Sequence, residues 1–157
     1  MSEATGSEQR HAAGAGLPTL RWSTSVVAEL ERRASRGYPH EVCGLMIGSQ
    51  TSNETFVARV TEARNLRTDR LGDRYRLDPE DFLMADADAR RDGLDVVGIW
   101  HTHPDHPPKP SQTDLESAWE GYSYVILAVR DAGVAGIRSW RIDGPHFREQ
   151  SIEEAIP

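Results

Sequence analysis

The chain has 157 residues with an ordinary apolar fraction, so it suits one compact domain that buries a core without structural staples. Its formal net charge of −7 disfavours a nucleic-acid partner, and no apolar run approaches the ~20 residues that span a bilayer. Because Cys43 is the only cysteine, an internal disulfide and the cysteine-based zinc-finger frameworks are excluded, and a cytoplasmic location is the expectation.

The N-terminal part of the chain is expected to be an arm followed by a strand and a helix. Residues 1–17 are rich in Ser, Glu, Ala and Gly and lack the basic start and apolar block of a signal peptide. We predict a disordered arm there and one domain over residues 18–150. Residues 19–22 can form a strand, and apolar residues then recur at helical spacing until Gly37 and Pro39 end the helix.

A hairpin is expected next. The segment 41–48, E-V-C-G-L-M-I-G, has apolar residues at both odd and even positions after its first residue. This pattern is typical of a central strand that is covered on both faces of the sheet. Residues 50–53 are turn-like, and residues 56–61 alternate between apolar and polar in the manner of a second strand. Residues 65–73 then read as a charged loop.

Helices and strands continue to alternate in the second half of the chain. Residues 74–77 can form a short strand, and the run D-P-E-D from Asp78 is a strong helix start, with an N-cap, a proline and acids at the positive end. We expect this helix to end near Ala89 and the apolar run 94–100 to form a buried strand. The elements expected after it are a proline-rich loop at 104–110, a helix at 111–118, strands at 124–129 and 137–142, and a tail at 151–157. This order favours an α/β sandwich of two or three layers.

The stretch 98–114, G-I-W-H-T-H-P-D-H-P-P-K-P-S-Q-T-D, carries a candidate metal site. Strand side chains at i and i+2 leave on the same face, so His101 and His103 can present their imidazoles to one ion. Asp114, just past the proline-rich loop, can supply a third ligand. Two nitrogens and one oxygen leave the fourth tetrahedral position to water, which is the pattern of a catalytic zinc site.

Each of these residues also has a purely structural interpretation. A lone H-x-H arises often by chance. Ser111-x-x-Asp114 matches a capping box, in which the serine side chain accepts from the Asp114 N–H and the aspartate side chain accepts from the Ser111 N–H. The presence of two histidines, a proline-rich loop, a serine and an aspartate together at fixed spacing favours the metal site. His106, His40 and Cys43 are weaker candidates: the two histidines stay undecided, and the cysteine is expected to be a small buried hydrophobe.

Glu41 begins an otherwise apolar strand and would be costly to bury without a partner. If its strand runs antiparallel to 94–100, its start lies beside the end of that strand, close to His101 and His103. A carboxylate there can take a proton from a zinc-activated water and pass it to a leaving amine, while the Ser111 hydroxyl can donate to the oxyanion. Exposure at the end of the sheet is the alternative for the glutamate, and capping is the alternative for the serine.

Glu41 followed by H-T-H-P, a proline-rich loop and P-S-Q-T-D resembles the JAMM, or MPN-plus, metallopeptidase motif. The resemblance covers about residues 21–140 and implies the MPN/JAB fold, a mixed central sheet flanked by helices, similar to cytidine deaminases. His101, His103 and Asp114 fall on the zinc-ligand positions, Glu41 on the acid/base position, Ser111 on the oxyanion-serine position, and Thr102 replaces the commoner serine.

The runs E-V-C-G-L-M-I-G and R-Y-R-L-D-P-E resemble the short bacterial and archaeal branch of this family, which includes Mec-type hydrolases. This resemblance implies one catalytic Zn²⁺ and hydrolysis after the C-terminal Gly-Gly of a ubiquitin-like or sulfur-carrier protein, with release of cysteine in some types. A non-catalytic scaffold or binding module and a metal-dependent amidase for small molecules are the alternatives. The oligomeric state cannot be read from the sequence.

Overall fold

The described part of the chain, residues 16–67 and 75–155 of a computed structural model, forms eight strands and three helices. The strands are β1 (Thr19–Ser23), β2 (Cys43–Gln50), β3 (Glu54–Ala63), β4 (Asp95–Pro104), β5 (Ser123–Arg130), β6 (Gly133–Asp143), β7 (His146–Gln150) and β8 (Ile152–Ala155). The helices are α1 (Thr24–Gly37), α2 (Pro79–Arg91) and α3 (Gln112–Ser117).

All of these strands belong to one mixed sheet in the order β7-β6-β5-β4-β2-β3-β1-β8. The pairs β4–β5, β3–β1 and β1–β8 are parallel, and the other pairs are antiparallel. The expected α/β fold with a mixed central sheet flanked by helices is therefore confirmed.

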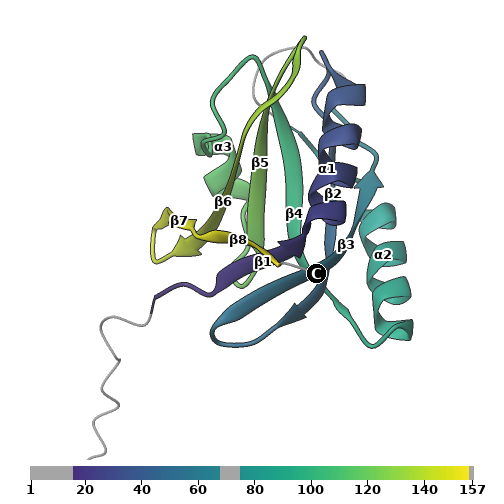
Figure 1. The fold of residues 1–157 in the computed structure, drawn as a ribbon, viewed down its shortest axis with the longest axis vertical. Helices are drawn as coiled ribbons and strands as arrows, with labels where there is room; N and C mark the ends of the chain where they lie inside the picture. The colour runs from purple at the N-terminus through teal and green to yellow at the C-terminus, as the bar shows by residue number, and fades with distance from the viewer. Residues whose placement is uncertain (1–15, 68–74, 156–157) are drawn as a thin grey trace, which may run out of the picture.

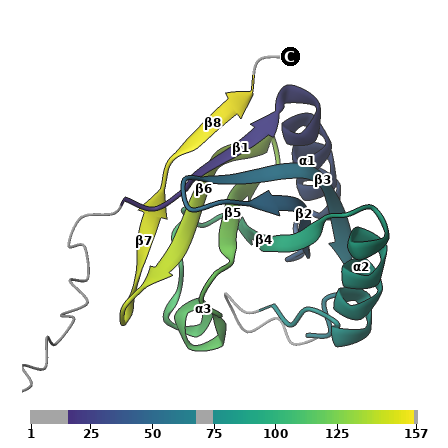
Figure 2. The ribbon, with the colours of Figure 1, turned by 90° about the horizontal axis from the view of Figure 1, so that it is seen from below.

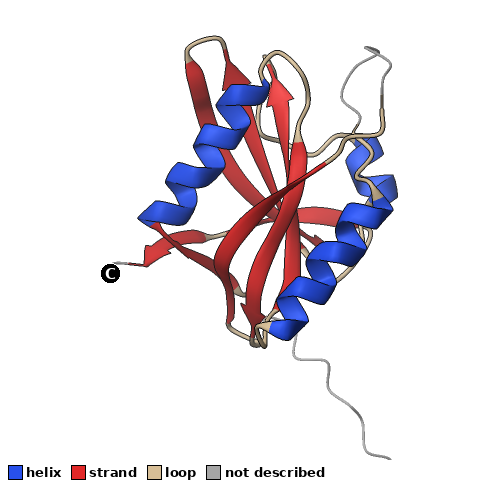
Figure 3. Ribbon diagram, turned by 90° about the vertical axis from the view of Figure 1, so that its right-hand side faces the viewer, coloured by secondary structure: helices blue, strands red, loops and turns tan. Residues whose placement is uncertain are grey.

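The two longer helices cover opposite faces of the sheet, as Figure 1 and Figure 3 show. One core cluster contains Leu30 of α1 and Met46 of β2. The other contains Ala89 of α2 together with Leu45 of β2. Because neighbouring side chains of β2 enter opposite clusters, this strand is buried on both faces, as the apolar run 41–48 predicted.

Local sequence explains where the two longer helices begin and end. The Ser23 hydroxyl caps α1 by accepting from the Val26 N–H at 3.3 Å. Asp78 caps α2, which begins with a proline, and the acidic residues of its first turn and the arginines of its last turn lie at the favourable ends of the helix dipole. Both helices are confirmed, and α2 ends at Arg91, close to the expected end near Ala89. Among the described residues, no helix combines the length and apolar character that crossing a membrane requires.

Two strand boundaries near the candidate site differ from those expected. β4 does not end at residue 100 but continues to Pro104, because His101 and His103 pair in parallel with β5. β2 begins at Cys43 rather than at Glu41, which therefore lies just before the ladder. The histidines sit within the sheet itself and not in the loop that follows it.

Among the described residues 75–77, no strand forms where one was expected at 74–77. Leu77 forms only an isolated antiparallel bridge with Asn65, flanked by backbone hydrogen bonds that close the base of a loop. Residues 68–74 lie outside the described residues, as does most of the arm expected at 1–17, so the charged loop is described only at its ends.

The last two strands were not expected from the sequence. Only Ser151 separates β7, which pairs with β6 at one edge of the sheet, from β8, which pairs with β1 at the other edge. Figure 2 shows the resulting curl, in which the two edge strands β7 and β8 follow one another in a continuous line. Their sequences, H-F-R-E-Q and I-E-E-A, carry mostly polar side chains, so they lack the apolar alternation that marks a strand. β8 lies within the segment expected to be a tail.

Gln150 links the two edges where the sheet curls back on itself. Its side chain is buried, its Oε1 accepts from the Ser139 hydroxyl of β6 at 2.8 Å, and its Nε2 donates to the Pro18 carbonyl before β1 at 2.7 Å. One amide thus satisfies polar groups from both edges of the sheet.

We predict that Gln150→Ala lowers the free energy of unfolding by about 1–3 kcal/mol, because two polar groups lose a buried partner. Urea denaturation followed by circular dichroism measures this change. Glu154→Ala, at an exposed position of β8, is the control and should stay within ~0.5 kcal/mol of the wild type. Equal stability of Gln150→Ala and the wild type would contradict the linking role.

Candidate metal centre and active site

His101 and His103 leave the same face of β4, a strand that is paired on both sides, with β2 and with β5. Both side chains are buried, with exposures of 1% and 4%. Their Nε2 atoms lie 3.2 Å apart. The two-residue spacing does bring the two imidazoles together.

Asp114 reaches this pair from the first turn of α3. Ser111 is the N-cap: its Oγ accepts from the Asp114 N–H at 3.1 Å, and Asp114 Oδ2 accepts from the Ser111 N–H at 2.8 Å. The same carboxylate places Oδ1 3.5 Å from His101 Nε2 and Oδ2 3.5 Å from His103 Nε2. The capping box and the approach to the histidines therefore occur together.

The three side chains are a group of possible metal ligands within 4.8 Å of one another. Neighbouring ligand atoms around a tetrahedral zinc lie about 3.3 Å apart, close to the observed separations of 3.2 and 3.5 Å. His103 Nδ1 donates to the Pro107 carbonyl at 2.9 Å, which leaves the lone pair of its Nε2 facing Asp114 and His101. The donor set and its spacing fit one zinc ion.

The electrostatics of the cluster follow from burial and from the shared carboxylate. Burial acts to raise the pKa of Asp114, but hydrogen bonding to His101 and His103 holds this pKa well below its usual range. Burial lowers the pKa of His101. Burial also acts to lower the pKa of His103, but hydrogen bonds to Asp114 and the Pro107 carbonyl raise it above the ordinary value. One anionic ligand beside two imidazoles is a donor set suited to a divalent cation.

Glu41 lies next to this cluster because of the register between β2 and β4. Cys43 pairs with His101 in this antiparallel ladder, so Glu41, two residues before Cys43, lies near the end of β4 that carries His103. The negative charge of Glu41 also contributes to the raised pKa of His103. The antiparallel pairing assumed from the sequence is confirmed, while the catalytic role of Glu41 stays a prediction.

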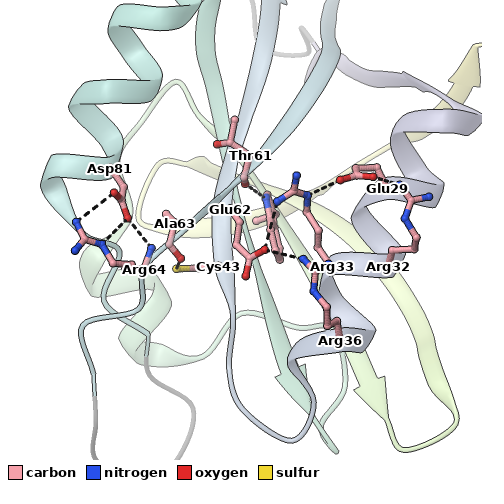
Figure 4. A network of polar contacts seen from close by, with 11 residues as sticks. Glu29, Arg32, Arg33, Arg36, Cys43, Thr61, Glu62, Ala63, Arg64 and Asp81 are labelled. Carbon is pink, nitrogen blue, oxygen red and sulfur yellow. Dashed lines mark hydrogen bonds and ion pairs between the residues drawn. The ribbon is translucent and has the colours of Figure 1, made fainter.

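Other sequence candidates lie outside the cluster. His40 and His106 are exposed, and neither belongs to the group of possible ligands formed by the described residues. Cys43 is fully buried, its thiol donates to the Ala63 carbonyl at 3.8 Å, and burial raises its pKa to about 12 (Figure 4). The expectation of a buried packing residue rather than a nucleophile is confirmed for this cysteine.

Two neighbours of the cluster were missed from the sequence. The Tyr75 ring stacks on His101, with ring centroids 4.3 Å apart, and Asn65 binds the backbone next to the cluster by donating to the Glu41 carbonyl at 3.2 Å. Both residues belong to the segment between β3 and α2. No spacing rule links them to the H-x-H pair, because the chain between them is long and folds back.

Comparison with known families identifies the relatives of this chain. A family model described as prokaryotic homologs of the JAB domain matches residues 23–143, from the N-cap of α1 to the end of β6. The chain belongs to the prokaryotic JAB family. This match covers the whole candidate site and confirms the resemblance inferred from the motif.

Individual relatives agree with this family. A desampylase from Haloferax volcanii is 33% identical over 130 residues, covering 82% of this chain and 88% of the relative. A CysO-cysteine peptidase from Mycobacterium tuberculosis is 32% identical over 135 residues, covering 81% of this chain and 85% of the relative. The solution structure of a protein from Desulfitobacterium hafniense is 26% identical with a TM-score of 0.77, covering 87% of this chain and 93% of that structure. With the buried His-His-Asp cluster, these relatives identify the chain as a JAMM-type metallopeptidase.

Proposed function

We propose that the chain is a zinc-dependent peptidase that hydrolyses the amide bond after the C-terminal Gly-Gly of a ubiquitin-like or sulfur-carrier protein. The observation that supports this most is the buried ligand set of His101, His103 and Asp114, which fits zinc and lies close enough to Glu41 for its charge to act on His103. The substrate class is supported by the similarity to a desampylase and a CysO-cysteine peptidase. The second of these relatives extends the proposal to the release of cysteine.

Each residue has a defined task in this proposal. His101, His103 and Asp114 would hold Zn²⁺. A zinc ion bound there would supply polarisation of the scissile carbonyl and acidification of a water molecule. Glu41 would take a proton from the attacking water as its oxygen bonds to the carbonyl carbon, and would deliver that proton to the amine nitrogen as the C–N bond breaks.

Ser111 combines its capping bond with a second task. A hydroxyl that accepts one hydrogen bond can still donate another, so the bond from Asp114 N–H leaves the Ser111 proton available. In the proposed reaction this proton is donated to the oxyanion as negative charge develops on the carbonyl oxygen. Capping and oxyanion binding are thus compatible tasks for one side chain in this proposal.

Glu41→Gln tests the proposal directly. The amide keeps the size of the side chain but cannot accept a proton, so we expect kcat to fall roughly 10²–10⁴-fold. Zinc per chain, measured by elemental analysis, should stay at the wild-type value because the three ligands are intact. Glu31→Gln, the same change at an exposed position of α1, is the control and should be fully active.

The results of this test separate the enzyme from a scaffold. An active Glu41→Gln protein would rule out the proposed acid/base role. A wild-type protein that carries no zinc, and gains no hydrolysis when zinc is added, would instead support a binding module.

We predict that Ser111→Gly separates capping from catalysis. Glycine is a tolerated N-cap that costs only a few tenths of a kcal/mol relative to serine, so the melting temperature should change little. It has no side chain to donate to the oxyanion, so kcat should fall roughly 10²–10³-fold, as when one oxyanion donor is removed. Ser111→Ala should lower both the melting temperature and kcat. Full activity of Ser111→Gly would limit this residue to capping.

The substrate class is tested by comparing a carrier-protein conjugate with its shortest fragment. We expect kcat/KM for a ubiquitin-like protein with a peptide or cysteine after its Gly-Gly to exceed that for a Gly-Gly amide by at least tenfold. The folded body of the carrier adds contacts that a short amide lacks. Equal values for the two substrates would favour a small-molecule amidase.

A further inference from the structure

The backbone of Glu41 lies just outside the regular ladder, where side chains hold it. Thr102 N–H donates to the Val42 carbonyl at 3.0 Å, and in a regular antiparallel pair the Val42 N–H would donate back to the Thr102 carbonyl. Instead, the Val42 N–H donates to the Thr102 hydroxyl at 3.0 Å. The Glu41 carbonyl, on the other side of the same peptide bond, accepts from the Asn65 amide at 3.2 Å.

We infer that Thr102 and Asn65 are positioning residues, which together orient the Glu41–Val42 peptide and thereby set where the Glu41 carboxylate lies relative to His103. This inference rests on the acid/base function proposed for Glu41. It assigns a task to two residues that touch neither the proposed metal nor the scissile bond.

Thr102 ties Glu41 to the strand that carries the metal ligands. It lies between His101 and His103 on β4, is fully buried, and points to the opposite face of the sheet. Because β5 holds this strand on its other side, the Thr102 hydroxyl is as fixed in place as the two imidazoles. The distance between the proposed base and the proposed ligands is therefore set within one pair of strands.

Asn65 supplies the second contact and is itself held at both ends of its amide. Its Nδ2 donates to Glu41, while its Oδ1 accepts from the N–H of Arg67 at 3.1 Å and of Arg76 at 2.9 Å. These last two bonds close the base of the loop between β3 and α2. One side chain thus joins this loop to the Glu41 backbone.

The residue before Asn65 anchors it to the start of α2. Arg64 N–H donates to Asp81 Oδ2 at 2.7 Å, and its guanidinium group pairs with the same carboxylate, as Figure 4 shows, and with Asp78 at 2.9 Å. The Asp78 N–H donates to the Arg64 carbonyl at 2.9 Å. The backbone next to Asn65 is therefore fixed by contacts between Arg64 and the first turn of α2.

Holding one peptide from both sides matters because proton transfer depends steeply on distance. A shift of about 1 Å in a catalytic group can cost on the order of 10²-fold in rate. Loss of either contact removes one of the two bonds that orient the Glu41–Val42 peptide and lets its orientation shift, while the metal ligands stay where they are. We expect a loss of kcat of about 10–100-fold with little change in KM or zinc content.

Thr102→Val and Thr102→Ser test the first contact. Valine keeps the shape but cannot accept from Val42 N–H, so kcat should fall, whereas serine keeps the hydroxyl and should restore most of the activity. Thr61→Val on β3 is the matched control, since the buried Thr61 hydroxyl has no hydrogen-bond partner among the described residues. It should leave kcat and the melting temperature unchanged.

Asn65→Asp and Asn65→Ala test the second contact. Aspartate keeps an acceptor for the N–H groups of Arg67 and Arg76 but loses the donor to Glu41, so kcat should fall while the melting temperature changes little. Alanine carries no charge and should lose at least as much activity, which separates the missing donor from repulsion between two carboxylates. Asn53→Asp, in an exposed turn, is the control.

Double variants with Glu41→Gln decide whether these residues act through the glutamate. If they do, adding Thr102→Val or Asn65→Asp to Glu41→Gln should cause no further loss of activity. Wild-type kcat in both Thr102→Val and Asn65→Asp, or a loss that persists in full in the Glu41→Gln background, would overturn the inference. An active Glu41→Gln single variant would instead overturn the proposed function.

Discussion

The carboxylate of Asp114 serves a helix cap and two buried histidines at once, and the geometry of the site depends on this double use. A buried anion is costly unless it is paired, and here its partners are the Ser111 N–H and the imidazoles of His101 and His103. α3 has only six residues, so it is too short to be stable without its cap and its contacts with the rest of the fold. The start of this helix and the ligand cluster therefore stabilise each other.

The paired strands around β4 supply the rest of the geometry. β5 holds one side of the strand that bears the histidines, and the register with β2 on its other side pairs His101 with Cys43, two residues after Glu41. The regular ladder ends before Val42, where the Thr102 hydroxyl accepts from the Val42 N–H and so holds the Glu41–Val42 peptide. The same pair of strands thus sets both the ligands and the proposed base.

Much of this site could be predicted because its signals are local. The H-x-H spacing defines one face of a strand, and S-x-x-D defines a helix start. Capping and metal binding were competing interpretations of Asp114, and the structure shows that one carboxylate reaches both sets of partners. The strands β7 and β8 escaped prediction for the opposite reason, because their residues are mostly polar and lack the apolar alternation that marks a strand.

The sequence by itself determined the residue types of the site, the faces on which the histidines lie, the start of α3 and the mixed α/β fold, since each depends on short-range periodicity or on a recognisable motif. The tertiary structure alone decided that Asn65 and Tyr75 would adjoin Glu41 and His101, and that Gln150 would join the two edges of the sheet. These contacts join residues far apart in the chain, and no local period encodes which distant backbone groups will need a partner once the sheet has curled.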